Sequence, residues 1–346
     1  MTTLAIIGAS GYTGVELARL LCNHPHVTLT AATSRQYDGQ PLSRVFPSLR
    51  DKTDLICRNH SVEALVDMAD FFFTAVPHKT AMDIVPTLLD AGKKVVDLSA
   101  DYRLRDVTTY QKWYQEHSSA DLLGEAVYGL PELYRDAIKT SRLTANPGCY
   151  PTSIILGLAP LLEAGLIDPT TILIDSKSGT TGAGRSANVA TLFCEVHDGF
   201  RAYKVGGQHR HIPEIEQEIN RFLETPITIT FTPHLLPVSR GILSTIYASL
   251  GPKTSLEKIH TLYTQQYAEE PFVRVLDQGS FPATQYVRGS NFCDIGLAID
   301  ERTNRVIIVS AIDNIVKGAA GQAVQNMNLM LGIDEKTGLE GAPFFP

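Results

Sequence analysis

A cysteine in an unusual setting is the first candidate for chemistry in this sequence. Cys149 lies in the stretch TANPGCYPT, between Pro147-Gly148 and Tyr150-Pro151. The prolines exclude regular structure before the cysteine, whereas the apolar segment that follows has helical spacing. Cys149 is therefore expected at the start of a helix, where unpaired N–H groups and the helix dipole favour a thiolate. A small buried residue in a tight turn is the alternative.

Two histidines supply the acid/base candidates. His209 and His211 lie in GGQHRHIPEIEQE, where they flank Arg210 and precede Pro213, a residue suited to a helix start. Histidine can protonate a leaving thiolate or phosphate near neutral pH. Solvated histidines in a charged loop are the alternative, and no carboxylate or cysteine at a useful spacing supports a metal site. Which histidine acts stays open.

Further residues could bind an anionic substrate. The loop SKSGTTGAGRSA, residues 176–187, offers N–H groups, hydroxyls and an arginine for an anion nest, and a flexible hairpin loop is the alternative. Asp101 and Arg103 follow a predicted parallel strand, at the end where ligands bind in such sheets. The candidates for substrate contact are Arg103, Ser178, Arg185, Lys204, His211 and Arg240.

A glycine-rich turn near the N-terminus predicts a nucleotide site. GASGYTG follows the first apolar strand and opens the first helix, so its backbone could approach a pyrophosphate at the helix N-terminus. The spacing differs from the dinucleotide fingerprint G-x-G-x-x-G, and a purely structural turn is the alternative. The cofactor contacts expected here are Gly8, Ser10, Gly11, Tyr12, Thr13 and Gly14.

The end of the second predicted strand favours NADP over NAD. An NAD-binding chain usually has a carboxylate there for the ribose hydroxyls. This sequence has Ser34 and Arg35 instead, a hydroxyl and a cation that suit a 2′-phosphate. A surface arginine in a loop is the alternative.

The elements that would carry these residues form two predicted domains of an α/β protein. Residues 1–148 alternate apolar strands with helices, which predicts a Rossmann-type doubly wound parallel sheet. Residues 149–312 are β-rich, and FCDIGLAIDERTNRVIIVSAID indicates a hairpin, so we expect an α+β catalytic domain with a mostly antiparallel sheet. The small-residue helix within residues 313–346 should pack on something flat, which assigns that segment to the first domain.

Composition excludes several classes of protein. The net charge is −7 with no basic run, which argues against a nucleic-acid partner. The five cysteines are scattered without a CxxC pair, which disfavours a disulfide framework or a zinc site. No apolar run reaches the ~20 residues of a membrane span, and the N-terminus does not read as a signal peptide. A cytoplasmic protein without a membrane partner is expected.

Taken together, the motifs resemble one enzyme family over essentially the whole chain. GASGYTGVELARLL, NPGCYPT and HRHIPEI, supported by SGTTGAGR, RAYKVGGQHRH, PHLLPVSRGIL and DNIVKGAAGQAVQNMN, are similar to the N-acetyl-gamma-glutamyl-phosphate reductases. The resemblance implies NADPH-dependent reduction of N-acetyl-L-glutamyl 5-phosphate to the 5-semialdehyde in arginine biosynthesis, with release of phosphate. A β-rich second domain often offers a sheet face for self-association, so a homodimer or homotetramer is expected.

The resemblance also assigns roles to individual residues. It implies that Cys149 is the nucleophile that forms a thioester and that His209 is the acid/base. Arg35 matches the family's arginine at the end of the second strand. The closing motif resembles the segment that returns to the cofactor, which places Asn314 and Lys317 near it.

Three other functions compete with this interpretation. An aspartate-semialdehyde dehydrogenase would share the architecture and the thioester chemistry, but NPGCYPT and HRHIPEI disfavour it. A reductase for the one-carbon-longer aminoadipyl phosphate is harder to exclude, because one methylene changes binding by only ~1–3 kcal/mol. A non-catalytic NADP-binding sensor would have no reason to keep both Cys149 and His209.

Overall fold

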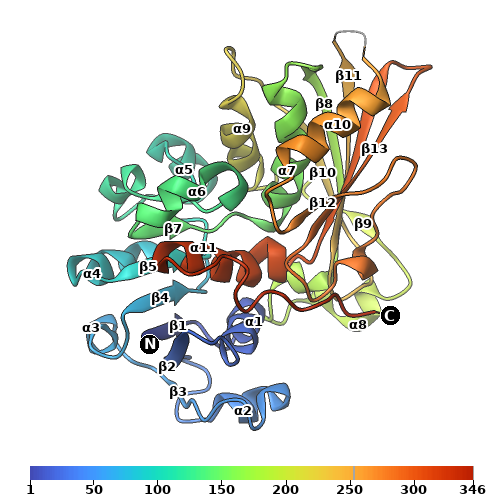
Figure 1. The fold of residues 1–346 in the computed structure, drawn as a ribbon. Coiled ribbons are helices and arrows are strands. Elements are labelled where there is room, and N and C mark those ends of the chain that lie inside the picture. The colour runs from blue at the N-terminus through green and yellow to red at the C-terminus, as the bar shows by residue number, and fades with distance from the viewer. Residues whose placement is uncertain (252–253, 346) are drawn as a thin grey trace. The chain divides into compact units, whose positions relative to one another are not determined.

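The computed structural model describes residues 1–251 and 254–345. The chain forms two compact units. The first consists of Met1–Pro147 and Ala319–Gly341, and the second of Gly148–Gly318 with the chain end from Ala342. Each unit is built on a seven-stranded sheet (Figure 1).

The sheet of the first unit is parallel throughout, with strand order β3-β2-β1-β4-β5-β7-β6. The order reverses beside β1, and ligands bind at such switch points in doubly wound sheets. All four residues of β4, FFFT, are buried, as expected for a parallel strand covered on both faces. The strands are β1 (Thr2–Ile7), β2 (Val27–Thr33), β3 (Cys57–Arg58), β4 (Phe71–Thr74), β5 (Lys94–Asp97), β6 (Val127–Tyr128) and β7 (Leu143–Ala145).

The helices of the first unit include one from the far end of the chain. They are α1 (Tyr12–Leu21), α2 (Leu42–Val45), α3 (Val62–Val66), α4 (Val85–Asp90), α5 (Val107–Trp113), α6 (Pro131–Thr140) and α11 (Gly321–Leu331). Two buried polar side chains of α11 are hydrogen-bonded within the unit. Asn326 donates to the carbonyl of Gly129, and Asn328 Oδ1 lies 3.0 Å from Nε2 of His24. Gly332 ends the helix in the left-handed conformation (φ 70°).

One predicted helix is shorter than its pattern indicated. The segment KTAMDIVPTLLDAG, residues 79–92, has the apolar spacing of a single helix. The structure instead has a 3-10 turn over Ala81–Asp83 and then α4. Pro86 explains the break, because a proline is accommodated in the first turn of a helix and not in its interior.

The second unit has a mixed sheet with order β12-β13-β14-β11-β8-β10-β9. Four of its neighbouring pairs are antiparallel and two are parallel, which confirms the mostly antiparallel prediction. The predicted hairpin is the β13–β14 pair. The strands are β8 (Ile167–Ser178), β9 (Arg201–Ala202), β10 (Thr230–Leu235), β11 (Ile242–Leu250), β12 (Val273–Val275), β13 (Cys293–Asp300) and β14 (Arg305–Ile312).

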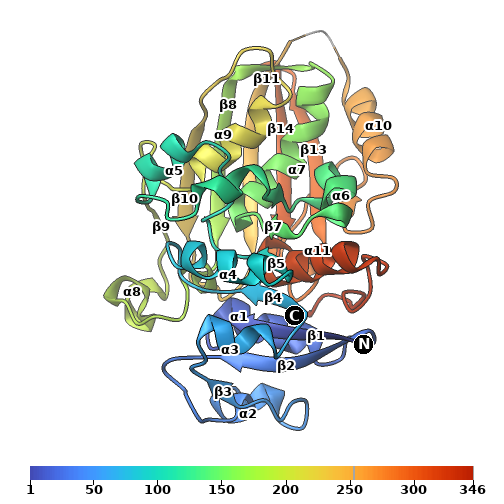
Figure 2. The same ribbon diagram turned by 90° about the vertical axis from the view of Figure 1, so that its left-hand side faces the viewer.

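Helices α7 (Cys149–Glu163), α9 (Ile212–Asn220) and α10 (Leu256–Gln266) lie on the same face of this sheet (Figure 2). Helix α8 (Phe193–Val196) is a single turn in the connection between β8 and β9. Residues 150–162 of α7 are all buried, because the helix is apolar all round and is enclosed by the sheet and by α9 and α10. The residue that starts this buried helix, Cys149, is only half-buried.

A tyrosine compensates for a proline inside α7. Pro160 has no N–H and cannot donate to the carbonyl of Leu156, one turn earlier. The hydroxyl of Tyr267, at the end of α10, donates to that carbonyl at 2.5 Å. Tyr263 makes a similar contact with the carbonyl of Gly157. Helix α10 therefore completes the backbone hydrogen bonding of α7.

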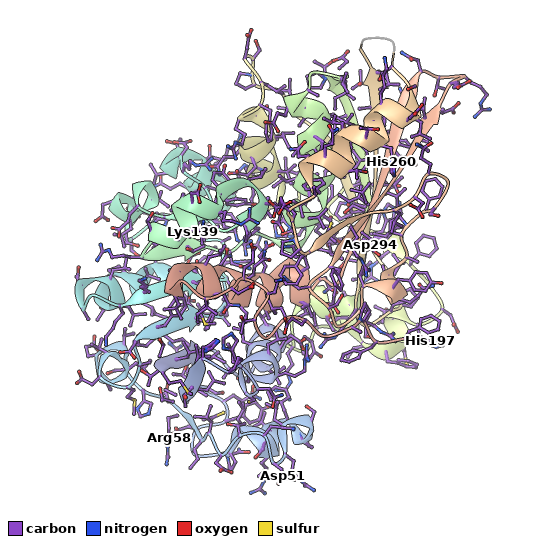
Figure 3. The ribbon with its side chains drawn as sticks, in the orientation of Figure 1. Asp51, Arg58, Lys139, His197, His260 and Asp294 are labelled. Carbon is purple, nitrogen blue, oxygen red and sulfur yellow. The ribbon has the colours of Figure 1, made fainter. Side chains whose placement is uncertain are left out.

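Side-chain contacts hold the edge of the second sheet in place. Asp294 of β13 forms a two-point ion pair with Arg274 of β12, with Nε–Oδ1 at 2.6 Å (Figure 3). Burial raises the pKa of Asp294, and the Arg274 charge opposes that rise. His260 of α10 hydrogen-bonds the main-chain oxygen of Leu276 at 2.9 Å. Side-chain contacts thus add to the backbone hydrogen bonds that join the short strand β12 to β13.

Candidate active site and cofactor cavity

Cys149 occupies the first position of α7, as the prolines around it predict. The N-cap is Gly148, which has an extended backbone (φ −68°, ψ 153°) and no side chain to satisfy the helix end. No acidic residue lies in the first turn. The positive end of the helix dipole therefore acts on the Cys149 sulfur, which favours its thiolate form.

His209 is buried in the same unit among aromatic rings. Its ring centre lies 5.4 Å from that of Tyr150, 5.7 Å from that of Tyr203 and 5.4 Å from that of Phe231. Its side chain is 7% exposed, so it is not a solvated loop histidine. Burial, with smaller contributions from the charges of Lys204 and Arg210, lowers the pKa of His209 to about 3. The imidazole is neutral at pH 7.

A backbone contact fixes the proton of that imidazole. The N–H of His211 donates to Nδ1 of His209 at 3.1 Å, so Nδ1 is the acceptor and the single ring proton of the neutral form is on Nε2. The His211 ring packs against the His209 ring at 4.8 Å. His209 therefore has a fixed tautomer in a buried ring, and it can donate through Nε2.

Two tyrosine hydroxyls lie beside the cysteine. Tyr150 Oη and Tyr203 Oη are 3.0 Å apart. Burial raises the pKa of Tyr203 to about 12 and also raises that of Tyr150, and a charge on Cys149 adds to both rises. The Ser178 side chain is a further hydrogen-bond partner of Tyr150. This group of neutral hydroxyls can solvate an anionic oxygen that forms near the sulfur.

The amide of Asn314 links the glycine-rich loop after β8 to the start of β11, in addition to backbone hydrogen bonds between the two segments. Asn314 accepts the N–H of Gly241 at 2.7 Å and donates to the hydroxyl of Thr181 at 3.0 Å. Asn314 therefore holds this loop within the second unit. Arg185, at the far side of the loop, is exposed.

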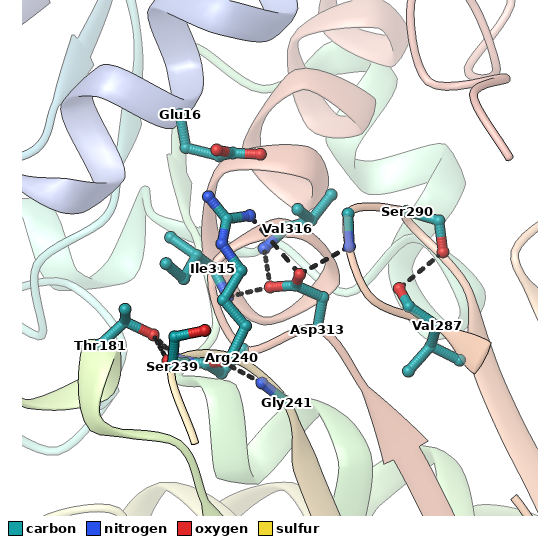
Figure 4. Close-up of polar contacts among 12 residues, drawn as sticks. Glu16, Thr181, Ser239, Arg240, Gly241, Val287, Ser290, Asp313, Ile315 and Val316 are labelled. Atoms are coloured by element: carbon teal, nitrogen blue, oxygen red, sulfur yellow. Dashed lines mark hydrogen bonds and ion pairs between the residues drawn. The ribbon is translucent and has the colours of Figure 1, made fainter. Parts of the chain in front are cut away.

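Arg240 is anchored by a buried carboxylate. Its guanidinium lies 3.5 Å from Oδ2 of Asp313, which also accepts the N–H of Gly289 (Figure 4). Oδ1 of Asp313 accepts the N–H groups of Ile315 and Val316. The same carboxylate thus orients Arg240 and the turn that precedes Lys317.

Two other predicted cations are enclosed. The Lys317 side chain is fully buried, with its nitrogen 5.7 Å from the centre of the Phe272 ring. Arg103, in the first unit, is 6% exposed and donates to the carbonyls of Leu98 and Asn146. Lys204 is more exposed, and its pKa is lowered by burial and by the charge of Arg210.

A cavity of about 820 Å³ opens at the carboxyl end of β1 in the first unit. Four predicted cofactor residues line it, namely Gly8, Ser10, Ser34 and Arg35. The rest of its wall comes from Ile7, Thr33 and residues within the ranges 59–65, 76–77 and 80–84. The other predicted contacts, Gly11 to Gly14, form the adjoining turn and the start of α1.

The glycine loop beside this cavity is closely packed. Gly8 has φ 94°, and a β-carbon on it would stand 2.4 Å from the carbonyl oxygen of Ala75. A β-carbon on Gly14 would stand 2.4 Å from the carbonyl oxygen of Gly8. These contacts match the reasons for which dinucleotide-binding turns need glycine. Ser10 and Ser34 are joined by a 2.9 Å hydrogen bond, and Arg35 is exposed at the cavity. The residues present fit a nucleotide with a 2′-phosphate.

The described residues contain neither a metal-binding cluster nor a membrane-spanning helix. No group of three or more His, Cys, Asp or Glu side chains that could hold a metal ion occurs within residues 1–251 and 254–345. No helix in that part of the chain is both long enough and apolar enough to cross a membrane.

Known proteins match the whole chain. Residues 3–141 match a family model described as semialdehyde dehydrogenase, NAD binding domain, and residues 149–314 match one described as semialdehyde dehydrogenase, dimerisation domain. A protein from Desulfotalea psychrophila named N-acetyl-gamma-glutamyl-phosphate reductase is 66% identical over 346 residues and all of both chains. A relative of the same name from Geobacter metallireducens is 60% identical over the same length.

The chain belongs to the N-acetyl-gamma-glutamyl-phosphate reductase family. This confirms the resemblance inferred from the motifs, and it makes the chain an oxidoreductase. The competing aspartate-semialdehyde dehydrogenase interpretation is therefore not needed.

Solved structures show that the chain has the semialdehyde dehydrogenase fold. Aspartate semialdehyde dehydrogenase with NADP from Candida albicans aligns with a TM-score of 0.72 at 17% identity, covering 96% of this chain and 98% of that chain. Aspartate semialdehyde dehydrogenase II from Vibrio cholerae aligns with a TM-score of 0.72 at 16% identity, covering 96% of this chain and 99% of that chain. At these identities the similarity establishes the fold alone.

Three residues around Cys149 were absent from the set of site residues predicted from the sequence. Tyr150 and Tyr203 could have been included, because both lie inside motifs that were singled out, NPGCYPT and RAYKVGGQHRH. Gly318 also lies inside a motif that was singled out, DNIVKGAAGQAVQNMN, but nothing in that motif indicated a contact with Cys149. Its backbone packs on the cysteine, and a β-carbon there would stand 2.7 Å from Cβ of Cys149.

Proposed function

We propose that the chain reduces N-acetyl-L-glutamyl 5-phosphate to N-acetyl-L-glutamate 5-semialdehyde with NADPH, releasing phosphate, as a step of arginine biosynthesis. The observation that carries the proposal is the half-buried thiol of Cys149 at the start of α7, beside the neutral hydroxyls of Tyr150 and Tyr203. The chain that carries this thiol is 66% identical over its full length to a protein named N-acetyl-gamma-glutamyl-phosphate reductase.

In the proposed mechanism Cys149 acts as the nucleophile. Its thiolate attacks the acyl carbon, a C–S bond forms, and the C–O bond to phosphate breaks so that phosphate leaves with the electron pair. NADPH, when bound, supplies the hydride that reduces the thioester to a thiohemiacetal. The hydroxyls of Tyr150 and Tyr203 solvate the oxygen on which negative charge develops.

His209 serves the collapse of the thiohemiacetal. Aldehyde release removes a proton from the adduct hydroxyl and returns one to the sulfur. The Nε2 proton of the neutral imidazole passes to the departing sulfur as the proton of the adduct hydroxyl replaces it on the ring, so no free imidazolate forms and the exchange has no net change. The Nδ1 contact with the His211 N–H supports His209 in this role.

The roles of the remaining site residues are also proposals. For substrate binding, the burial of Ser178 beside Tyr150 supports that residue most directly. The other proposed substrate contacts are Arg103, Arg185, His211 and Arg240. The proposed NADP contacts are Gly8, Ser10, Gly11, Tyr12, Thr13, Gly14, Ser34, Arg35, Asn314 and Lys317. Residues 1–148 with 313–346 form the proposed cofactor domain, and residues 149–312 the catalytic and dimerisation domain.

The preference for NADP is assigned to Arg35. A charged hydrogen bond to the 2′-phosphate contributes ~1.5–3 kcal/mol, so Arg35→Ala should raise the KM for NADPH by about tenfold or more. The KM for NADH should hardly change, since NADH has no phosphate at that position. A parallel rise in both KM values would contradict this role.

We also propose that the chain assembles as a homodimer or homotetramer in the cytoplasm, without a nucleic-acid or membrane partner. Ile246 and Ile308 face α7, so strand alternation directs Leu243, Ile307 and Val309 to the opposite face of the sheet. These three side chains are half-buried in one chain. A charge at that face, Val309→Asp, should shift the sedimentation mass towards that of a monomer.

The decisive test is turnover in the phosphate-dependent reverse direction. N-acetyl-glutamate semialdehyde, phosphate and NADP are mixed with the wild type, Cys149→Ser and the exposed-cysteine control Cys194→Ser, and NADPH formation is followed. Wild type and control should turn over, whereas Cys149→Ser should lose nearly all activity and keep NADPH binding. Loss of both in Cys149→Ser would mean that the cysteine is structural. A wild type inactive here but active on the aspartyl or aminoadipyl analogue would refute the proposed substrate.

A further inference from the structure

The starts of α7 and α9 exchange hydrogen-bond partners. His211 is the N-cap of α9, and Glu214 is the third residue of that helix. In a capping box, a glutamate at this position accepts the N–H of its own N-cap residue. Here the His211 N–H is donated to Nδ1 of His209 instead, at 3.1 Å. The Glu214 carboxylate accepts the N–H of Gly148 at 2.8 Å.

Gly148 is the N-cap of the other helix, α7. A glycine has no side chain for capping, so a carboxylate from 66 residues away along the chain takes its N–H. Glu214 is 1% exposed, and a hydrogen bond from a backbone N–H to a buried carboxylate is short and strong. The backbone that leads directly into Cys149 is therefore fastened to the first turn of α9.

The two contacts together join the nucleophile to the proton donor. Glu214 accepts the N–H of Gly148, the residue before Cys149. The His211 N–H, which Glu214 would accept in a capping box, is donated to His209 and sets its tautomer. We propose that Glu214 is a positioning residue, which fixes the Cys149 sulfur relative to His209 without contacting the substrate. The proposal rests on the function proposed above, because it assumes that Cys149 and His209 are the reacting groups.

The same helix supplies a matched control. Glu216 also accepts one backbone N–H from another segment, that of Ile229, at 3.1 Å. Its contact leads away from Cys149. Each substitution removes a carboxylate that accepts a backbone N–H of another segment, so a comparison of the two separates loss of stability from loss of positioning.

The test compares Glu214→Ala, Glu214→Gln and Glu216→Ala with the wild type by kcat, KM, Tm and the rate of Cys149 alkylation by iodoacetamide without substrate. Misplacement by about 1 Å costs ~100-fold, so Glu214→Ala should lower kcat by about that factor with little change in KM. Glutamine keeps the acceptor oxygen but not the charge, so Glu214→Gln should stay within about tenfold of the wild-type kcat. Glu216→Ala should keep the wild-type kcat and alkylation rate.

Three results would overturn the proposal. The first is a wild-type kcat and alkylation rate in Glu214→Ala, and the second is a rise in KM alone in that variant. The third is a Glu214→Gln variant as inactive as Glu214→Ala, which would mean that the carboxylate charge itself contacts the substrate. If Glu214→Ala does not fold, Glu214→Asp replaces it, because its acceptor falls short of Gly148. Failure of the proposed function is distinguishable, since the wild type would then not turn over while alkylation rates still compare the variants.

Discussion

The backbone of Gly318 packs directly on the side chain of Cys149, so that a β-carbon on residue 318 would stand 2.7 Å from Cβ of the cysteine. Gly318 belongs to a π-helical turn, Val316–Ala320, and its N–H donates to the carbonyl of Asp313 at 2.9 Å. Gly318 cannot move away from the cysteine relative to Asp313 without breaking that bond. We therefore expect Gly318 to limit the positions that the sulfur can adopt.

Gly318→Ala should displace Cys149. Overpacking of this kind costs ~1–3 kcal/mol, so the Tm should fall by several degrees. The kcat should fall about tenfold or more, because the thiol moves from its reactive position. Iodoacetamide alkylation of Cys149 reports that displacement without substrate. Gly124→Ala is the control, since a β-carbon there meets nothing within 4 Å, and equal kcat losses in both variants would contradict the prediction.

The burial of His209 predicts a pH dependence of stability. Its pKa in the folded chain is lowered to about 3, below the ordinary value of about 6.5 that it regains on unfolding. Between these values the unfolded chain binds the extra proton, so stability is full above pH ~6.5 and falls as the pH falls towards 3. The slope from one such group is at most ~1.4 kcal/mol per pH unit.

Urea unfolding between pH 4.5 and 7.5 measures this slope. His209→Gln should have a flatter profile than the wild type, because the titrating group is gone. The exposed His26 provides the control His26→Gln, which should keep the wild-type slope. An unchanged slope in His209→Gln would show that another group causes the acid loss of stability.

The glycine turn predicts that two neighbouring substitutions have different effects. A β-carbon on Gly14 meets the Gly8 carbonyl oxygen at 2.4 Å, whereas one on Gly11 meets its nearest atom at 3.8 Å. Gly14→Ala should therefore lower the Tm in the absence of cofactor. Gly11→Ala should keep the Tm but weaken NADPH binding, if the pyrophosphate approaches that backbone. Thermal unfolding and NADPH fluorescence titration measure the two effects, and normal NADPH affinity in Gly11→Ala would contradict the proposed contact.

Local rules in the sequence were sufficient for the helix starts and for the sheet types. Pro147 and Pro151 predicted where α7 begins, and Pro213 predicted the start of α9. Alternation and turn residues predicted the β13–β14 hairpin. Each of these features depends on residues within a few positions of one another, and such constraints can be read from the chain without knowledge of its tertiary contacts.

The contacts around Cys149 depended on residues far apart in the chain and could not be predicted in this way. Glu214 at the third position of a helix would ordinarily cap that helix, and nothing local indicates that it serves Gly148. The π-helical turn that brings Gly318 to the cysteine was read as regular helix, because one extra residue in a turn leaves no signal in the apolar pattern.

The tyrosine that compensates for Pro160 has a consequence for how the chain is made. The carbonyl of Leu156 receives its hydrogen bond from Tyr267, 111 residues later. During synthesis the residues of α7 leave the ribosome long before Tyr267 has been added. In the nascent chain the Leu156 carbonyl therefore lacks its hydrogen bond from Tyr267, and the apolar surface of α7 is exposed to water. Cys149, at the start of α7, can reach its final position only when the strands and α10 have been translated. A ribosome-bound chain stalled before residue 256 would be a candidate for chaperone capture rather than a partly active enzyme.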